Sequence, residues 1–181
     1  MIREVAVEYE GNVAELNIKP LTAVVLTALL APQLNTVNMV NAPVVAKERG
    51  IEVAETVLER RGDYASLLRV TVVTDRYERS VAGTLVANDK PRLVDIKGIA
   101  VEADFAPHML YVTNQDRPGF IGRFGMVLAN AEINIATFHL GRAAQGGDAI
   151  CLVSLDGPLP EPVLAEVRAL PLVMQATALK F

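Results

Sequence analysis

The sequence MLYVTNQDRPGFIGRFGMVLAN, residues 109–130, decides the fold of the second half of the chain. Its first five residues are mostly apolar or β-branched, which is typical of a short strand. Beyond Pro118, the apolar residues Ile121, Phe124 and Leu128 recur at i, i+3 and i+7, and this spacing predicts a helix over residues 118–130 with one buried face. The stretch therefore predicts a strand that leads directly into a helix.

The residues that follow extend this unit in a recognisable order. Strands are expected at 133–140 and 149–155, a helix at 161–170 and a last strand at 173–181. Leu164, Val167 and Leu170 give the second helix its apolar face. The order β-α-β-β-α-β is that of the ferredoxin-like fold, so both helices are expected to cover one face of a four-stranded antiparallel sheet.

The first half predicts a separate mixed α/β domain. A strand is expected at 3–9, and an apolar helix at 21–30 behind Pro20. A second helix, over 35–49, is capped by Asn35 and bent or split by Pro43. Strands at 51–58, 67–74 and 81–87 follow, with a polar connection at 60–64 and a short hairpin at 92–97 and 99–103. We place the boundary after this hairpin, which gives an α+β protein with domains 1–105 and 106–181.

Composition restricts the classes of function. Hydrophobic residues make up 51% of the 181 residues and charged residues 21%, which indicates a folded chain. The net charge of −4, without a basic run, argues against nucleic acid as a partner. The longest apolar run, residues 21–31, is shorter than the roughly 20 residues of a membrane span. A single cysteine, Cys151, excludes an internal disulfide and a multi-cysteine metal site, so we expect no metal and a cytoplasmic location.

The turn between the first strand and helix of the second half carries the most chemistry. The backbone N–H groups of Gly119, Phe120 and Ile121 are expected to point out of the helix end, where they favour a carboxylate. Asp116 is placed to accept hydrogen bonds from an ammonium group, and Asn114 offers an amide to a small polar group. A zwitterionic amino acid needs these groups together.

Each of these residues also has a simpler interpretation. Asp116 can be a helix cap, and Asn134, which begins the next strand, can be a turn residue. Cys151 lies in an apolar run typical of a core thiol. His108 and His139 have no acidic or hydroxyl neighbour at a spacing that indicates a catalytic triad, so we expect structural or surface roles and no catalytic residue in this chain.

The second half resembles an ACT domain of the D-3-phosphoglycerate dehydrogenase type. The resemblance rests on NQDRPGFIG (114–122), INIA (133–136), LGR (140–142) and GG (146–147). ACT domains are small regulatory modules that bind amino acids, and in this family serine sits between two of them that pair edge to edge. The resemblance implies that Asn114 and Asp116 contact serine from one chain and that Asn134 reaches it from the other.

The first half resembles the intervening domain of the long-form enzymes of the same family. The segments concerned are VNMVNAP (37–43), AKERGI (46–51), VAGTL (81–85) and PRLVDI (91–96). The resemblance implies an anion-binding domain, with Lys47, Arg49 and Arg92 as candidate ligands; solvated surface charges are the alternative. The Gly-x-Gly-x-x-Gly turn that binds NAD in the parent enzymes does not occur in the sequence, so we expect no cofactor in this chain.

The sequence thus predicts a homo-oligomeric regulatory region that binds L-serine or a similar small amino acid and lacks the catalytic NAD domain. Two alternatives remain. One is a β-type subunit of an L-serine dehydratase, whose iron–sulfur cluster needs cysteines that this sequence lacks. The other is an ACT module that only assembles subunits and has lost its ligand.

Overall fold

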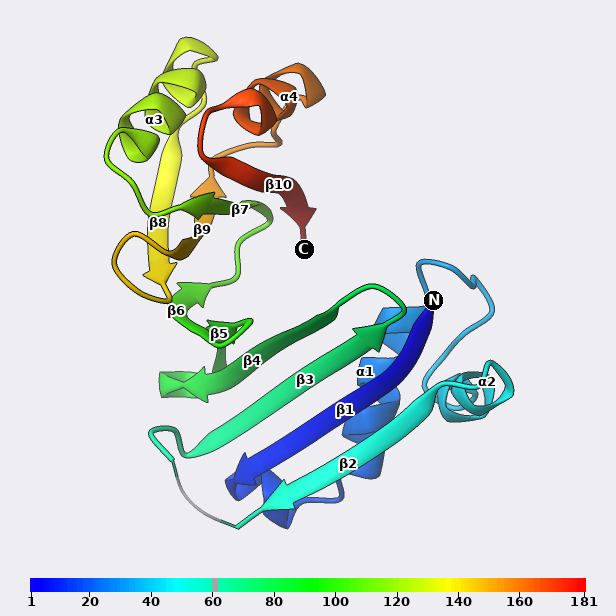
Figure 1. Cartoon of the computed structure of the whole chain (residues 1–181). Helices are drawn as coiled ribbons and strands as arrows, with labels where there is room; N and C mark the ends of the chain where they lie inside the picture. Colours follow the sequence, from blue (N-terminus) through cyan, green and yellow to red (C-terminus); the bar gives the residue numbers. More distant parts are fainter. Residues whose placement is uncertain (60–61) are drawn as a thin grey trace. The chain divides into compact units, whose positions relative to one another are not determined.

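The computed structural model describes residues 1–59 and 62–181 and divides into two compact units, Met1–Lys90 and Pro91–Phe181. Figure 1 shows the elements of both in chain order. The polar connection predicted at 60–64 begins at two residues, 60 and 61, that lie outside the described part.

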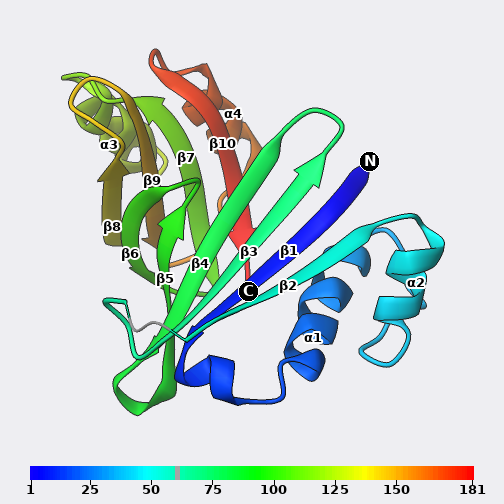
Figure 2. The same cartoon turned by 60° about the horizontal axis from the view of Figure 1, so that its bottom comes forward.

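The first unit consists of four paired strands with two helices on one face. Its elements, in chain order, are β1 (Ile2–Gly11), the 3-10 helix η1 (Asn12–Glu15), α1 (Lys19–Leu30), α2 (Ala42–Glu48), β2 (Glu52–Leu58), β3 (Ser66–Thr74), β4 (Glu78–Val86) and the 3-10 helix η2 (Ala87–Asp89). The strand order is β2-β1-β3-β4, and β1 pairs parallel with β2 and antiparallel with β3. Both helices connect β1 to its parallel neighbour and lie on the same side of the sheet (Figure 2).

The core of this unit forms where β1 meets α1. Val5, Val7 and Tyr9 alternate along β1 and are fully buried, and they pack against Leu26 and Leu30 of α1. Alternation places the remaining β1 side chains on the opposite face, where Glu8 pairs with Arg69 of β3 at 3.5 Å between the charged groups. One face of the sheet is therefore apolar and helix-covered, and the other carries charges.

The helix predicted over residues 35–49 is wrong in its first half. The structure has turns up to Asn41, and α2 occupies only Ala42–Glu48. Pro43 lies in the first turn, so it begins the helix instead of bending it, since its missing N–H has no intrahelical role there. Asn38 Oδ1 and Asn41 Oδ1 accept backbone N–H groups of this segment, and these local bonds compete with a helix.

The second unit contains the predicted ferredoxin-like sheet. Its elements are β5 (Lys90–Ile96), β6 (Ile99–Asp104), β7 (His108–Gln115), α3 (Phe120–Asn130), β8 (Ile135–Arg142), β9 (Asp148–Leu155), α4 (Glu161–Ala169) and β10 (Val173–Lys180). Strands β10-β7-β9-β8 form an antiparallel sheet in that order. Phe124 of α3 and Leu164 of α4 pack with Val112 and Val153 on one face, which confirms the α+β fold class and the placement of both helices.

A hairpin covers the other face of this sheet. Ile99 and Val101 of β6 pack against Ile150 and Leu152 of β9 and against Met109 of β7. Figure 2 shows β6 beside β8 and β9. By these contacts the hairpin belongs to the second compact unit, whereas the sequence-based division at 105/106 assigns it to the first domain.

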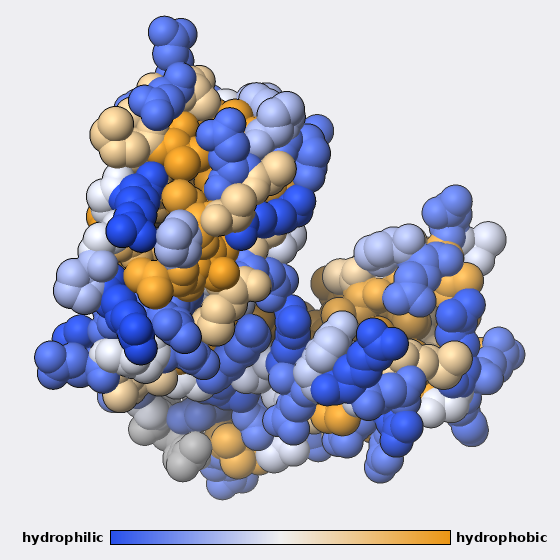
Figure 3. Space-filling model, turned by 45° about the horizontal axis from the view of Figure 1, so that its top comes forward, coloured by the Kyte–Doolittle hydropathy of each residue, from blue (hydrophilic) through white to orange (hydrophobic). Residues whose placement is uncertain are grey.

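Apolar side chains also reach the surface of the second unit. Ile121, Met126, Leu140 and Met174 are each more than two-fifths exposed. Figure 3 shows apolar surface in orange interrupted by hydrophilic residues in blue on one face of the molecule. No helix within the described residues is long and apolar enough to cross a membrane.

Candidate functional site

The turn from β7 into α3 is shaped by Pro118 and Gly119. Pro118 has no N–H to donate, and Gly119 takes the left-handed conformation at φ 95°, which strains residues with a side chain. The helix begins at Phe120, and no side chain among the described residues caps it. Asp116 is thus not the cap of α3, and this simpler interpretation of the residue is wrong.

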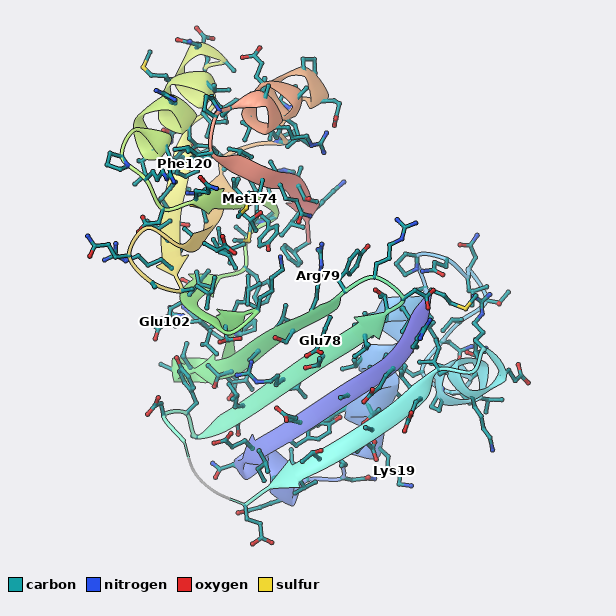
Figure 4. All side chains as sticks on the ribbon, viewed as in Figure 1. Lys19, Glu78, Arg79, Glu102, Phe120 and Met174 are labelled. Carbon is teal, nitrogen blue, oxygen red and sulfur yellow. The ribbon has the colours of Figure 1, made fainter. Side chains whose placement is uncertain are left out.

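The open start of α3 presents backbone donors. The first-turn N–H groups of an α-helix have no intrahelical acceptor, and the carbonyl of Gly119 already accepts the N–H of Arg123. The Phe120 side chain is 2% exposed and stacks on Phe124 with ring centroids 5.7 Å apart, so only its backbone faces outward. Figure 4 labels Phe120 at this helix end. Ile121 is exposed on the adjoining surface, and the turn can hold an anion by its backbone.

Asp116 lies beside this helix end and is held by two donors. Its Oδ2 accepts hydrogen bonds from the Gly146 N–H at 3.1 Å and from Arg142 Nη1 at 3.0 Å. The Gly146 N–H, followed by the Arg142 guanidinium, lowers the pKa of the Asp116 carboxyl below its ordinary value. The carboxylate is ionised at neutral pH, and none of the described residues donates to its other oxygen, Oδ1.

Arg142 is a site residue that sequence reasoning missed. Strands β7 and β8 both run antiparallel to β9, so their C-terminal ends meet at the same edge of the sheet. Asn114 and Arg142 pair with the same residue, Ala149. The signal in the sequence was the LGR segment at 140–142, but only the strand order shows that its arginine faces Asp116.

Asn114 lies beneath the turn and is 2% exposed. Its Nδ2 donates to the Gln115 carbonyl at 2.9 Å, and its Oδ1 accepts the Cys151 thiol at 3.5 Å. Both ends of the amide are therefore engaged inside the chain. Cys151 is fully buried, as predicted for a core thiol, and burial raises its pKa to about 12.

Asn134 lies at the opposite end of the sheet from Asp116. It immediately precedes β8, whose far end is Arg142, and eight strand residues span about 25 Å. Its Nδ2 donates to Asp156 Oδ2 at 2.7 Å. Within one chain the structure therefore brings Asn114, Asp116 and the start of α3 together and keeps Asn134 apart.

The three candidate anion ligands are also separated. Lys47, in the last turn of α2, lines one cavity of the first unit, and Arg49 lines another. Arg92 is in the second unit, where its guanidinium donates to Asp104 Oδ1 at 2.9 and 3.1 Å. Neither cavity contains more than one of the three residues.

Comparisons with known proteins agree with this fold. The family model of the D-3-phosphoglycerate dehydrogenase intervening domain matches residues 1–97, and that of the ACT domain matches residues 108–172. D-3-phosphoglycerate dehydrogenase of Bacillus subtilis is 38% identical over 94% of this chain, which covers 33% of the relative. The enzymes of Synechocystis sp. and Methanocaldococcus jannaschii are 35% and 32% identical, again over 94% of this chain.

The chain spans about a third of the length of these curated relatives. The matched regions cover both units, and the two models follow one another in the order that the sequence predicts. We conclude that the chain belongs to the D-3-phosphoglycerate dehydrogenase family and comprises its intervening domain followed by an ACT domain.

Proposed function

We propose that this chain is a regulatory region of D-3-phosphoglycerate dehydrogenase that binds L-serine as a feedback effector. The observation that carries the proposal is the uncapped start of α3 beside the ionised carboxylate of Asp116, in a domain of the amino-acid-binding ACT family. The serine carboxylate would bind the N–H groups of Gly119, Phe120 and Ile121. Its ammonium group would donate to Asp116 Oδ1, and its hydroxyl oxygen would accept a hydrogen bond from Asn114 Nδ2 once that group releases the Gln115 carbonyl.

A second copy of the chain would complete the site. Strand β8 is the outer strand of its sheet among the described residues, so its edge can pair with another strand. Antiparallel pairing of β8 with β8 of a second copy would place Asn134 of the partner subunit at the Arg142 end, near Asp116. This supports a homo-oligomer with an isologous interface that carries two such sites.

Regulation would act through a difference between the affinities of serine for two arrangements of the subunits. Serine that binds one subunit arrangement more tightly shifts the population toward it, by no more than the difference in its binding free energies. The proposal assigns catalysis and NAD to the part of the enzyme beyond this chain, and no dehydrogenase activity to the chain itself. It also assigns the protein to the cytoplasm and to L-serine biosynthesis.

The test is isothermal titration of the chain with L-serine, with glycine, L-alanine and L-aspartate for comparison. We expect selective serine binding, weakened about a hundredfold in Asp116→Ala because a charged hydrogen-bond partner of a partly desolvated ammonium is lost. Asp63→Ala removes an exposed carboxylate of the first unit and is the matched control. Asn134→Ala should weaken binding only if the partner subunit contributes that residue.

Sedimentation in the same buffers separates the remaining outcomes. A dimer that tightens with serine supports the interface site. A dimer that binds none of the four amino acids would instead be an assembly module, and a monomer that binds serine would place the whole site in one chain. Unchanged serine affinity in Asp116→Ala would reject the proposed ammonium contact.

A further inference from the structure

The second unit contains a cavity of about 410 Å³ on the sheet face that the β5–β6 hairpin covers. Thr113 of β7 pairs with Gln175 of β10 on one side and with Ile150 of β9 on the other, so these side chains form one row across the sheet. Ile99, the first residue of β6, packs against Ile150 from the hairpin. All four residues line the cavity, which therefore lies between three strands and the hairpin.

The hydroxyl group of Thr113 is a buried polar group in this cavity. Thr113 is 7% exposed, and within residues 1–59 and 62–181 no group forms a hydrogen bond with its side chain. A buried hydroxyl group is normally paired, because burial removes its hydrogen bonds to water. The buried side chains of Asn114 and Ser154 in the same sheet each have such a partner, at 2.9 Å. Thr113 therefore offers a donor and an acceptor to a ligand in the cavity.

Two side chains of opposite charge also line the cavity. Asp148 is the first residue of β9, and its carbonyl oxygen accepts the N–H of Ala143 at 3.0 Å, which closes the preceding loop. No described residue pairs with its carboxylate. Lys97 lies in the turn of the hairpin, with Nζ 6.0 Å from the centre of the Tyr111 ring. A ligand with one negative and one positive group can therefore contact both charges.

We propose that this cavity binds an α-amino acid with an apolar side chain. Lys97 and the Thr113 hydroxyl donate to its carboxylate, and Asp148 accepts from its ammonium group. Ile99, Ile150 and Met174, which Figure 4 labels on β10, contact its side chain. The volume of the cavity exceeds that of an amino acid as small as serine, so an apolar side chain has room beside these residues.

This site is separate from the proposed serine site. Thr113 and Asn114 are consecutive residues of β7, so their side chains lie on opposite faces of the sheet. Asn114 contacts Cys151 on the face that α3 and α4 cover, whereas Thr113 lies beside Ile150 on the hairpin face. The cavity is also complete within one copy of the second unit. The inference therefore adds a second effector site and does not depend on pairing between chains.

Probes that lack one charged group test this chemistry in the full chain. L-Leucine and L-methionine are compared with isopentylamine, which has no carboxylate, and with 4-methylpentanoate, which has no ammonium group. Titration calorimetry gives the affinities, and methyl NMR signals of Ile99, Ile150 and Met174 report the location. We expect at least one of the two amino acids to bind and to shift these signals. Each one-charge probe should bind at least about tenfold more weakly, because one charge-assisted contact is lost.

Variants separate the cavity from surface charge and from the serine site. Asp148→Asn and Thr113→Val, which preserve side-chain shape, should each weaken the binding of the apolar amino acid about tenfold. Glu166→Gln, at an exposed position of α4, should leave it unchanged. Asp116→Ala should weaken serine binding alone, which distinguishes failure of this site from failure of the serine site. Methyl signals that stay unshifted, unchanged affinity in Asp148→Asn, or equal affinity for isopentylamine would overturn the proposal.

Discussion

The two sheets of this protein bury their strands differently. In the second unit, every residue of β9 from Ala149 to Leu155 is buried, because α3 and α4 cover one face and the β5–β6 hairpin the other. In the first unit, helices cover only one face, and along β1 the buried residues Val5, Val7 and Tyr9 alternate with half-buried ones. A strand covered on both faces is a continuous apolar run, whereas a strand covered on one face alternates.

This difference shows what the hairpin contributes. Ile99 and Val101 supply the second layer without which Ile150 and Leu152 would lie on an open sheet face. The hairpin is therefore part of the core of the ACT unit, although the ACT family model begins only at residue 108. Our proposed boundary at 105/106 separates the two matched families, and the boundary by contacts lies before Pro91.

The largest effect that tests this comparison is expected when one side chain is truncated on the face of each sheet that lies away from its helices. Leu152→Ala removes a side chain that is 2% exposed beneath the hairpin, and should lower the free energy of unfolding by about 2–5 kcal/mol. Thr71→Ala, on the helix-free face of β3, should change it by less than about 1 kcal/mol. Urea unfolding followed by unit-specific amide NMR signals measures both.

Equal losses in the two variants would contradict the comparison. A small loss in Leu152→Ala would mean that the hairpin does not exclude water from this face in solution. A large loss in Thr71→Ala would mean that the polar face of the first unit is covered by something else, for example a second copy of the chain.

An intermediate effect is expected where the hairpin comes closest to the sheet. A Cβ on Gly141 of β8 would clash with the carbonyl oxygen of Ala100 in β6, so Gly141→Ala should destabilise the unit by about 1–3 kcal/mol. A Cβ on Gly125 of α3 would extend into open space, and Gly125→Ala should stabilise by about 0.5–1 kcal/mol through helix propensity. Thermal unfolding by circular dichroism compares the two.

The comparison of Gly141→Ala with Gly125→Ala tests whether the hairpin packs against this unit. If Gly141→Ala has the same stability as the unchanged protein, the hairpin is not packed against β8. A Cβ at position 141 would also press on the side chain of Ile99, so the losses in Gly141→Ala and Ile99→Ala should not add in the double variant. Strict additivity would place the cause of the Gly141→Ala loss outside the hairpin.

The smallest effect concerns the ion pair between Asp116, in the turn after β7, and Arg142, the last residue of β8. The folded pKa of Asp116 is lowered, so its contribution to stability is present above the ordinary value of 3.8 and is lost as pH falls from there through the folded pKa. Asp116→Asn should therefore flatten the acid-side fall in stability of the second unit. Asp148→Asn, an exposed carboxylate of the same unit, is the control, and a parallel slope in both variants would reject the assignment.

Much of the fold was predictable from local patterns. The spacing of Ile121, Phe124 and Leu128 predicted the helix α3, in which Phe124 and Leu128 are fully buried. Ile121 is more than half exposed, because a spacing of i and i+3 does not tell which side of a helix faces the sheet. The helix prediction for residues 35–41 was wrong for a related reason. The side chains of Asn38 and Asn41 accept hydrogen bonds from nearby backbone N–H groups, and these local bonds compete with those of a helix.

The candidate site was predicted only in part. Asp116, Gly119 and the helix start are neighbours in sequence, so their proximity follows from chain geometry. Sequence alone determined the element order, the turn chemistry and the family. Tertiary structure decided that Arg142 meets Asp116, that Asn134 lies at the far end of the sheet, and that Glu55 is fixed by Tyr9 through Thr22. These contacts join residues 13 to 33 positions apart, and only strand order and packing, which no local pattern encodes, bring such residues together.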